Sequence, residues 1–149
     1  MRPARAVLSI VLLATALLVA LAGCRSAAVE YIPEGGTYTL AEVQERATSF
    51  DVRDADELTT AEASAERVDR LVYLRKQGDR AAALADALTT GFPTDNASVP
   101  VLVEHATVDE REVWVVVEVW GEPGGRLTHR RLWLLDYGTL DVVNSSSFS

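Results

Sequence analysis

Two histidines and the carboxylates near them are the side chains of this sequence best suited to acid–base chemistry. His105 directly follows Glu104, and His129 comes soon after Glu118 in the second half of the chain. An imidazole paired with a carboxylate could act as a general acid or base in hydrolysis. A serine hydrolase would also need its nucleophile in a strained turn, and the sequence contains no G-x-S-x-G motif. We therefore expect no enzyme, and keep an acid–base hydrolase as an alternative.

Metal, cofactor and nucleic-acid sites have equally little support. Glu104 or Glu118 could join the histidines at a metal, but no H-E-x-x-H or similarly close spacing is present. The acidic run at 51–57 lacks the glycine and the twelve-residue spacing of a calcium-binding EF-hand loop. No glycine-rich phosphate loop occurs, and a net charge of −8 repels nucleic-acid backbones. We expect no metal, no cofactor and no nucleic-acid partner.

The first 24 residues have the pattern of an export leader. Arg2 and Arg5 are followed by an uncharged stretch at 6–23, in which leucine, valine and alanine dominate, and then by Cys24. A positive start, an apolar centre and small residues before the cleavage point are typical of a signal peptide. The uncharged stretch also approaches the length of a membrane-spanning helix, so an uncleaved membrane helix is the alternative.

The only cysteine of the chain completes a short motif at the end of this leader. The order Leu21-Ala22-Gly23-Cys24 resembles the lipobox of bacterial lipoproteins, which consists of a leucine, two small residues and the modified cysteine. The resemblance covers the first sixth of the chain. It implies that a signal peptide of residues 1–23 is removed and that Cys24 carries a diacylglyceryl membrane anchor. Two acyl chains hold a protein at a membrane, where one chain is marginal.

The lipobox also implies a location. A bacterial lipoprotein is expected on the outer face of the cytoplasmic membrane, or on the periplasmic side if the envelope has an outer membrane. Loss of Arg2 and Arg5 with the leader would lower the formal charge of the chain from −8 to −10. This charge disfavours close docking on anionic lipids. We expect the anchor to hold the protein while the domain itself stays in the aqueous space.

The rest of the chain is expected to form a tether and one domain. Residues 24–38 contain Pro33 and Gly35 and show no sustained periodicity, which predicts a flexible tether. Residues 39–149 have the length of a single domain.

Two helical segments are expected in this domain. Thr39 and Glu42 have the spacing of a capping box and predict a short helix over 39–50. Residues 60–90 also favour helix, and Gly78 either kinks one helix or separates two. The apolar stripe of this second segment comprises Val68, Leu71 and Val72.

Past Pro100 the apolar residues recur with a period of two, which predicts strands. The expected strands are 99–107, 112–120, 127–135 and 139–145. Short links join consecutive strands and predict an antiparallel meander. The serines within 145–149 predict a solvated tail. The fold class is therefore α+β, with one or two helices packed on a four-stranded antiparallel sheet, similar in topology to a cystatin-like or NTF2-like arrangement.

The register of the meander follows from the expected link lengths. A three-residue link at 109–111 would place the valines of both strands on one face, under the helices. The expected opposite pairs are Val101 with Val119, Val103 with Val117, and His105 with Val115. A four-residue second link would place Trp114 opposite Trp133 and Glu118 opposite His129. A longer loop or a bulge would shift those pairs.

The other face of the sheet is the candidate binding face. It combines three tryptophans with charged side chains, namely Trp114, Trp120, Trp133, Glu118, His129 and Arg131. Tryptophan joins a large apolar area to one N–H donor, so this face could bind a protein, a glycan or a lipid tail. The alternative is that the rings pack under the tether or the short first helix as a second core.

Three functions are consistent with these patterns. The first is a membrane-anchored envelope lipoprotein with a non-catalytic, protein-binding domain. The second is a small-ligand or lipid carrier or sensor, which would need a pocket of roughly 300 Å³ or more between helix and sheet. The third is an envelope hydrolase with a glutamate–histidine pair in a cleft. We expect the first, because no motif supports the other two.

Overall fold

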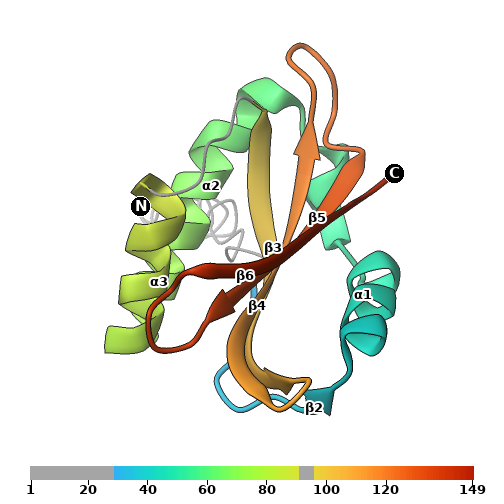
Figure 1. Cartoon of the computed structure of the whole chain (residues 1–149). Coiled ribbons are helices and arrows are strands. Elements are labelled where there is room, and N and C mark those ends of the chain that lie inside the picture. Colours follow the sequence, from blue (N-terminus) through green and yellow to red (C-terminus); the bar gives the residue numbers. More distant parts are fainter. Residues whose placement is uncertain (1–28, 91–95) are drawn as a thin grey trace, which may run out of the picture.

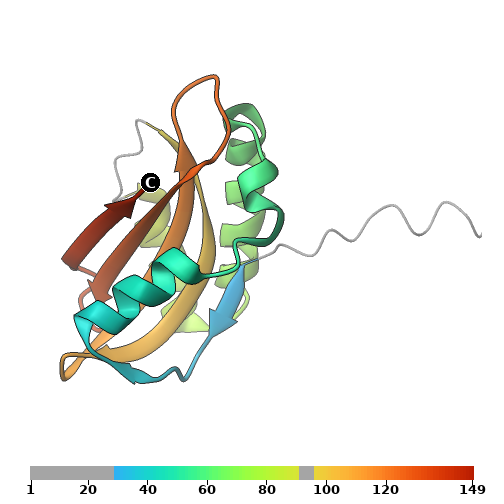
Figure 2. The ribbon, with the colours of Figure 1, turned by 90° about the vertical axis from the view of Figure 1, so that its right-hand side faces the viewer.

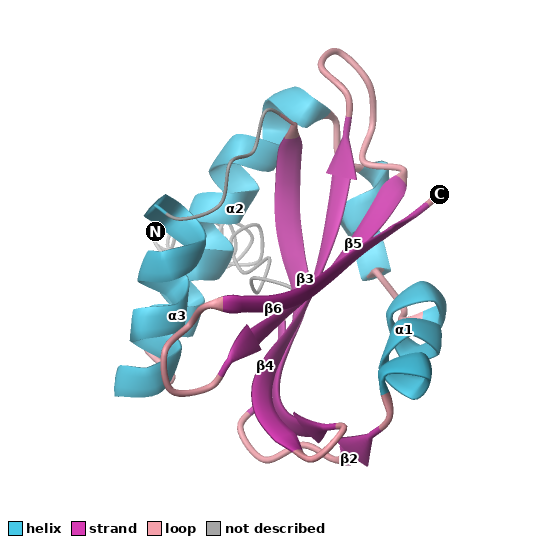
Figure 3. Cartoon of the chain, viewed as in Figure 1, coloured by secondary structure: helices cyan, strands magenta, loops and turns pink. Residues whose placement is uncertain are grey.

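The computed structural model of the protein describes residues 29–90 and 96–149. These residues form a six-stranded sheet with helices on both faces (Figure 1, Figure 3). The strands are β1 (Glu30–Ile32), β2 (Thr37–Tyr38), β3 (Ala97–Val108), β4 (Arg111–Gly121), β5 (His129–Asp136) and β6 (Val142–Phe148). The helices are α1 (Leu40–Ser49), the 3-10 turn η1 (Arg53–Glu57), α2 (Thr60–Arg75) and α3 (Asp79–Thr90). The expected leader and its lipobox lie outside the described residues.

The strands follow one another across the sheet in the order β1-β3-β4-β5-β6, and β2 also pairs with β3. From β3 to β6 the sheet is an antiparallel meander, whereas β1 and β2 run parallel to β3. Helices α2 and α3 lie on one side of the sheet and α1 lies on the other (Figure 1, Figure 2). The α+β class is confirmed, but the sheet is mixed and larger than the four strands expected. Within the two described segments, no helix is long and apolar enough to cross a membrane.

Part of the expected tether belongs to the sheet. Both β1 and β2 come from it, and Val29 is buried in the core together with side chains of α2 and α3. Between the two strands Gly35 packs so closely against Glu104 that an added Cβ would collide with the carboxylate. The tether predicted over 24–38 is therefore wrong from Val29 onward. Strands of two and three residues are too short to give the periodicity on which the prediction depended.

The expected helices are present with their caps. In α1 the Thr39 side chain accepts from the Glu42 backbone, and the Glu42 carboxylate accepts from the Thr39 backbone, which confirms the capping box. The second segment forms two helices, α2 and α3, because Gly78 between them adopts a φ of 125°. The stripe predicted for α2 was partly wrong, since Val68 and Val72 are 59% and 41% exposed.

The first hairpin is tighter than expected. Its link is the two-residue turn Asp109–Glu110, with φ values of 45° and 68° that suit a hairpin of right-handed twist. His105 therefore lies opposite Trp114, and a β-bulge near Pro100 shifts the register again toward the start of β3. The predicted register, which assumed a three-residue link, is wrong by one residue between the turn and the bulge and by two residues beyond the bulge.

The two faces of the sheet are consequently covered by other elements than expected. Val116 lies on the other face of the sheet, but the remaining four valines of β4 share one face, which packs against α1 and η1. Its core includes Val113, Val115, Val117 and Val119 with Val43 and Ala47 of α1. The face that carries Trp114 packs under α2 and α3. A register shift of one residue moves every side chain of β3 to the opposite face of the sheet. The hydrophobic pattern alone did not distinguish between these two registers.

The last two strands are also displaced from their expected positions. Across β4 and β5, Trp120 lies opposite His129 and Glu118 opposite Arg131, two residues away from the predicted pairs. Strand β6 runs from Val142 to Phe148 instead of over 139–145. Most of the predicted solvated tail therefore pairs with β5.

Asp136 organises the turn that leads into β6. Its Oδ1 accepts from the Gly138 and Thr139 backbone N–H groups, each at 3.0 Å, and its Oδ2 accepts from Arg111 Nη2 at 2.8 Å. The Thr139 backbone, the Arg111 side chain and the Gly138 backbone together lower the pKa of Asp136 from 3.8 to about 2. The carboxylate thus stabilises the turn in its ionised form.

Replacement of Asp136 by Asn should destabilise the protein at neutral pH but not at about pH 2. A depressed pKa gives stability that is present above the pKa of the unfolded chain and is lost as the pH falls through the folded-state value. The difference in urea midpoint between the protein and Asp136→Asn should therefore close between about pH 4 and pH 2. A difference that does not change with pH would contradict a contribution from the ionised carboxylate.

Replacement of Val117 by Asp should unfold the protein or cost about 3–5 kcal/mol, because it buries an unpaired carboxylate in the core. Val142→Asp is the matched control, since Val142 lies on β6 and is 49% exposed. Urea unfolding followed by circular dichroism measures both. Equal, small effects would mean that the valine face of β4 is not buried.

Candidate functional site

The structure brings most of the predicted binding face together on the α2 and α3 side of the sheet. Trp120, His129, Arg131 and Trp133 are neighbours on β4 and β5, and each is partly exposed. Trp114 is separate: it is 1% exposed and packs in the core under the helices, so it is not part of an accessible face.

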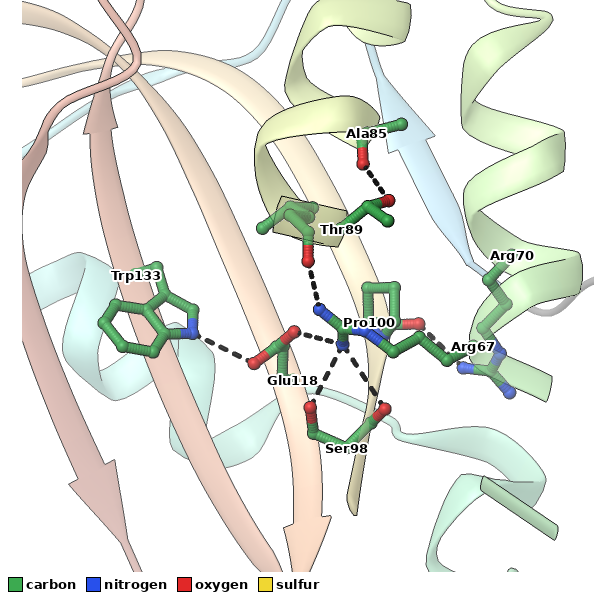
Figure 4. A network of polar contacts seen from close by, with 9 residues as sticks. Arg67, Arg70, Ala85, Thr89, Ser98, Pro100, Glu118 and Trp133 are labelled. Atoms are coloured by element: carbon green, nitrogen blue, oxygen red, sulfur yellow. Dashed lines mark hydrogen bonds and ion pairs between the residues drawn. The ribbon is translucent and has the colours of Figure 1, made fainter. Parts of the chain in front are cut away.

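Glu118 is the buried centre of this face. Its Oε1 accepts from Arg67 Nη1 at 2.6 Å, and its Oε2 accepts from Trp133 Nε1 at 3.0 Å (Figure 4). Arg67 also donates to the Ser98 hydroxyl at 3.0 Å and to the Leu88 carbonyl at 2.8 Å. The carboxylate therefore joins α2, the end of α3 and three strands, and it has no exposed surface through which to act on a substrate.

Arg131 lies between two indole rings. Its guanidinium carbon is 5.0 Å from the centre of the Trp120 ring and 5.3 Å from that of Trp133. Both distances are within the range of cation–π attraction. Glu118 lies directly across from Arg131 in the paired strands, but its carboxylate bonds to Arg67 instead. The Arg131 guanidinium makes no hydrogen bond or ion pair with any residue that the structure describes.

Two exposed serines extend this surface toward the edge of the sheet. In β6, Ser145 lies opposite Trp133 and Ser147 opposite Arg131, so their side chains share the same face. On the other side the His129 ring contacts the Trp120 ring at a tilt of 32°, with 4.6 Å between ring centres. We call this surface the tryptophan–arginine shelf. It consists of Trp120, His129, Arg131, Trp133, Ser145 and Ser147.

The second predicted carboxylate, Glu104, is on the opposite face of the sheet from its neighbour His105. It is 1% exposed and bonds to Arg46 Nη2 at 3.0 Å, to the Tyr38 hydroxyl at 2.9 Å and to the Gly36 backbone N–H at 3.2 Å. Burial, followed by the hydrogen bond to Glu104, raises the pKa of Tyr38. The predicted Glu104–His105 pair does not form, because successive strand residues point to opposite faces.

His105 instead pairs with residues that sequence reasoning did not select. Its ring stacks on Tyr137 at 3.8 Å between ring centres, and its Nδ1 lies 3.2 Å from the Pro33 carbonyl oxygen. Because a carbonyl only accepts, Nδ1 carries the proton of this contact. Nε2 faces Glu112 Oε1 at 3.7 Å, at the edge of a cleft of about 160 Å³. The two side chains have the types of an acid–base pair, but the 3.7 Å between them is longer than a hydrogen bond.

Sequence reasoning also missed the arginines that bind the buried groups of the sheet. Arg70 is 2% exposed and donates to the Pro100 carbonyl at 2.8 Å, beside the bulge of β3. Arg67, Arg70, Leu71 and Leu74 recur at the spacing of one helix face. Two arginines within an otherwise apolar stripe were a signal that α2 meets buried acceptors.

Comparisons with known proteins add no further information. No family model matches this chain, and no curated protein or solved structure matches it. Among residues 29–90 and 96–149, no group of three or more histidine, cysteine, aspartate or glutamate side chains is placed to hold a metal ion. The geometry of the shelf and the motif at Cys24 are therefore the features that bear on function.

Replacement of Arg67 by Met should cost about 3–5 kcal/mol of unfolding free energy, since it leaves the Glu118 carboxylate buried without its cation. The double variant Arg67→Met/Glu118→Met should recover much of this loss because no buried charge remains. Urea unfolding of both single variants and the double variant measures the coupling.

Arg75→Met is the matched control for this experiment. Arg75 pairs with Asp86 on the surface, where the two side chains are 36% and 69% exposed, and its loss should cost less than about 1 kcal/mol. If Arg67→Met costs no more than this control, the buried ion pair does not hold the helices to the sheet.

Proposed function

We propose that this protein is a membrane-anchored envelope lipoprotein whose domain binds a protein partner through the tryptophan–arginine shelf and is not an enzyme. The observation that carries the binding role is the partly exposed stack of Trp120, Arg131 and Trp133. Tryptophan and arginine are the residue types enriched in the energetic centres of protein interfaces. Here Trp133 is held in position by its hydrogen bond to the buried Glu118 carboxylate.

The anchor is proposed from the sequence motif Leu21-Ala22-Gly23-Cys24. Its diacylglyceryl group would hold the protein on the outer face of a cytoplasmic membrane, or on the periplasmic side in an envelope with an outer membrane. The acidic charge of the chain supports a domain that stays in the aqueous space, because it opposes contact with anionic lipids.

The contacts of the acidic side chains support a non-catalytic role. Glu104 and Glu118 are buried in ion pairs with Arg46 and Arg67, away from solvent. These ion pairs join helices to the sheet. Both carboxylates therefore have a structural use that explains their presence.

One observation favours the hydrolase as a second candidate. His105 Nε2 and Glu112 Oε1 lie 3.7 Å apart beside a cleft. The nearby backbone N–H groups are already used, however, since Gly35 donates to the His105 carbonyl and Gly36 to Glu104. Neither is free to stabilise an oxyanion, so we rank this function below protein binding.

The carrier has less support. Large apolar side chains occupy the interface between the sheet and α2 and α3, where the expected ligand pocket would lie. They include Leu71, Leu74, Leu84, Leu88, Val103 and Val116. Space for a ligand among these side chains would require them to move apart, and the open hollow of about 590 Å³ beside the start of α3 is lined mainly by charged residues such as Arg80, Glu112 and Asp136.

The anchor is tested by mass spectrometry of the protein extracted from its own membrane. The expected mass is that of a chain that begins at an acylated Cys24. The variant Cys24→Ser should lose the lipid mass and leave the membrane fraction or change its location, with an unchanged circular dichroism spectrum. A full-length mass without lipid, with unchanged membrane retention, would favour the uncleaved helix.

The binding role is tested in the same native spectra with Trp120→Ala. A second protein that is bound to the unchanged chain should be lost from this variant, because the variant removes one wall of the shelf. Val142→Ala is the control, since it trims an exposed apolar side chain on β6 without touching the stack. A small-molecule adduct in place of a protein would favour the carrier.

A further inference from the structure

The tryptophan–arginine shelf carries a local positive charge in an acidic protein. Around Glu118, the charges of Arg67 and Glu118 cancel each other in their ion pair. Arg131 has no such partner among the described residues, so the cluster retains one positive charge. The chain as a whole has a net charge of −8. An uncompensated arginine at a fixed place on such a surface suits a ligand that brings the missing negative charge.

The stack leaves the hydrogen-bonding edge of Arg131 available. The two indoles lie near the guanidinium of Arg131 at 5.0 and 5.3 Å, where their rings attract the cation and limit its motion. A guanidinium carries five N–H donors in its plane and none of them has a partner here. This planar fork matches the two oxygens of a carboxylate. Because the arginine is already ordered, little side-chain entropy is lost when it binds.

The neighbours of Arg131 add donors for the same ligand. The Ser147 hydroxyl lies across from Arg131 on β6, and Ser145 lies across from Trp133. Both serines are exposed and make no hydrogen bond through their side chains to a described residue. The His129 ring contacts Trp120. These groups can donate to an anion, and the indole faces provide apolar contact beside it.

We infer that the shelf binds a carboxylate group of an acidic segment in the partner protein, which rests on the proposed protein-binding function. A single guanidinium that supplies one positive charge matches one carboxylate. A phosphate group carries more charge and is usually held by several cations or by a helix N-terminus. Arg131 is the residue that would bind the carboxylate directly, and Trp120 and Trp133 would position Arg131 and contact the apolar part of the segment.

The test uses the full isotope-labelled chain in detergent micelles, titrated with sodium acetate and with poly-L-glutamate at constant ionic strength. The nuclear magnetic resonance signals of Arg131 Nε–H and of the two indole N–H groups should shift and saturate, at lower concentration for the polymer. Arg131→Gln should weaken poly-L-glutamate binding about tenfold or more, and Arg131→Lys should restore only part of it. Arg126→Gln removes the same charge from an exposed loop position and should weaken binding less than about twofold.

The absence of saturable shifts at Arg131 would overturn the inference. Equal weakening in Arg131→Gln and Arg126→Gln would also overturn it, because it would indicate attraction by overall charge. Saturation with polyphosphate but not with poly-L-glutamate would overturn the assignment to an acidic protein segment. Folding of each variant is verified from the dispersion of the remaining amide signals.

Failure of the carboxylate site can be distinguished from failure of the protein-binding function. A protein partner that stays bound to Arg131→Gln in native spectra would overturn the carboxylate site and leave the protein-binding function in place. Saturable carboxylate binding by a chain that never retains a protein partner would support the site and overturn the proposed function.

Discussion

The arrangement of this protein depends on one buried ion pair, between Glu118 on β4 and Arg67 on α2. A carboxylate and a guanidinium lose their hydration when they are buried, and only good geometry with further hydrogen bonds compensates for this loss. Arg67 meets this requirement by also binding Ser98 and the last turn of α3, and Glu118 by accepting from Trp133. The pair thus fixes two helices and three strands relative to one another. It also orients one of the rings that enclose Arg131, so the exposed shelf takes its geometry from the buried pair.

The opposite face of the sheet uses the same kind of contact. Glu104 on β3 binds Arg46 of α1, the Tyr38 hydroxyl and the backbone of Gly36. Each helical layer is therefore attached to the sheet by an arginine that reaches a buried carboxylate, in addition to the apolar core on that side. These directional contacts specify where along the strands a helix can sit, which apolar packing alone specifies less strictly.

Sequence patterns predicted the helices and strands better than the register and pairing between them. Helix α1 followed from the capping box of Thr39 and Glu42, and the strands of the meander from their period of two. The register could not be predicted, because it depended on Asp109 and Glu110 adopting left-handed conformations that favour glycine or asparagine. The aromatic and charged members of the shelf were predicted as a group, but its two serines and its arrangement required the pairs across β4, β5 and β6. Strands β1 and β2 form only through distant contacts with β3 and leave no local signal.

The incorporation of β1 into the sheet bears on how an anchored molecule would be oriented. Val29 is buried five positions after Cys24, and five fully extended residues span at most about 18 Å. A lipid on Cys24 would hold the β1 edge of the sheet within this distance of the bilayer surface. The strand order places β6 at the other edge, with β5 and the shelf next to it. Such a short connection would limit rotation of the domain and turn the shelf outward, toward molecules that approach from the aqueous side.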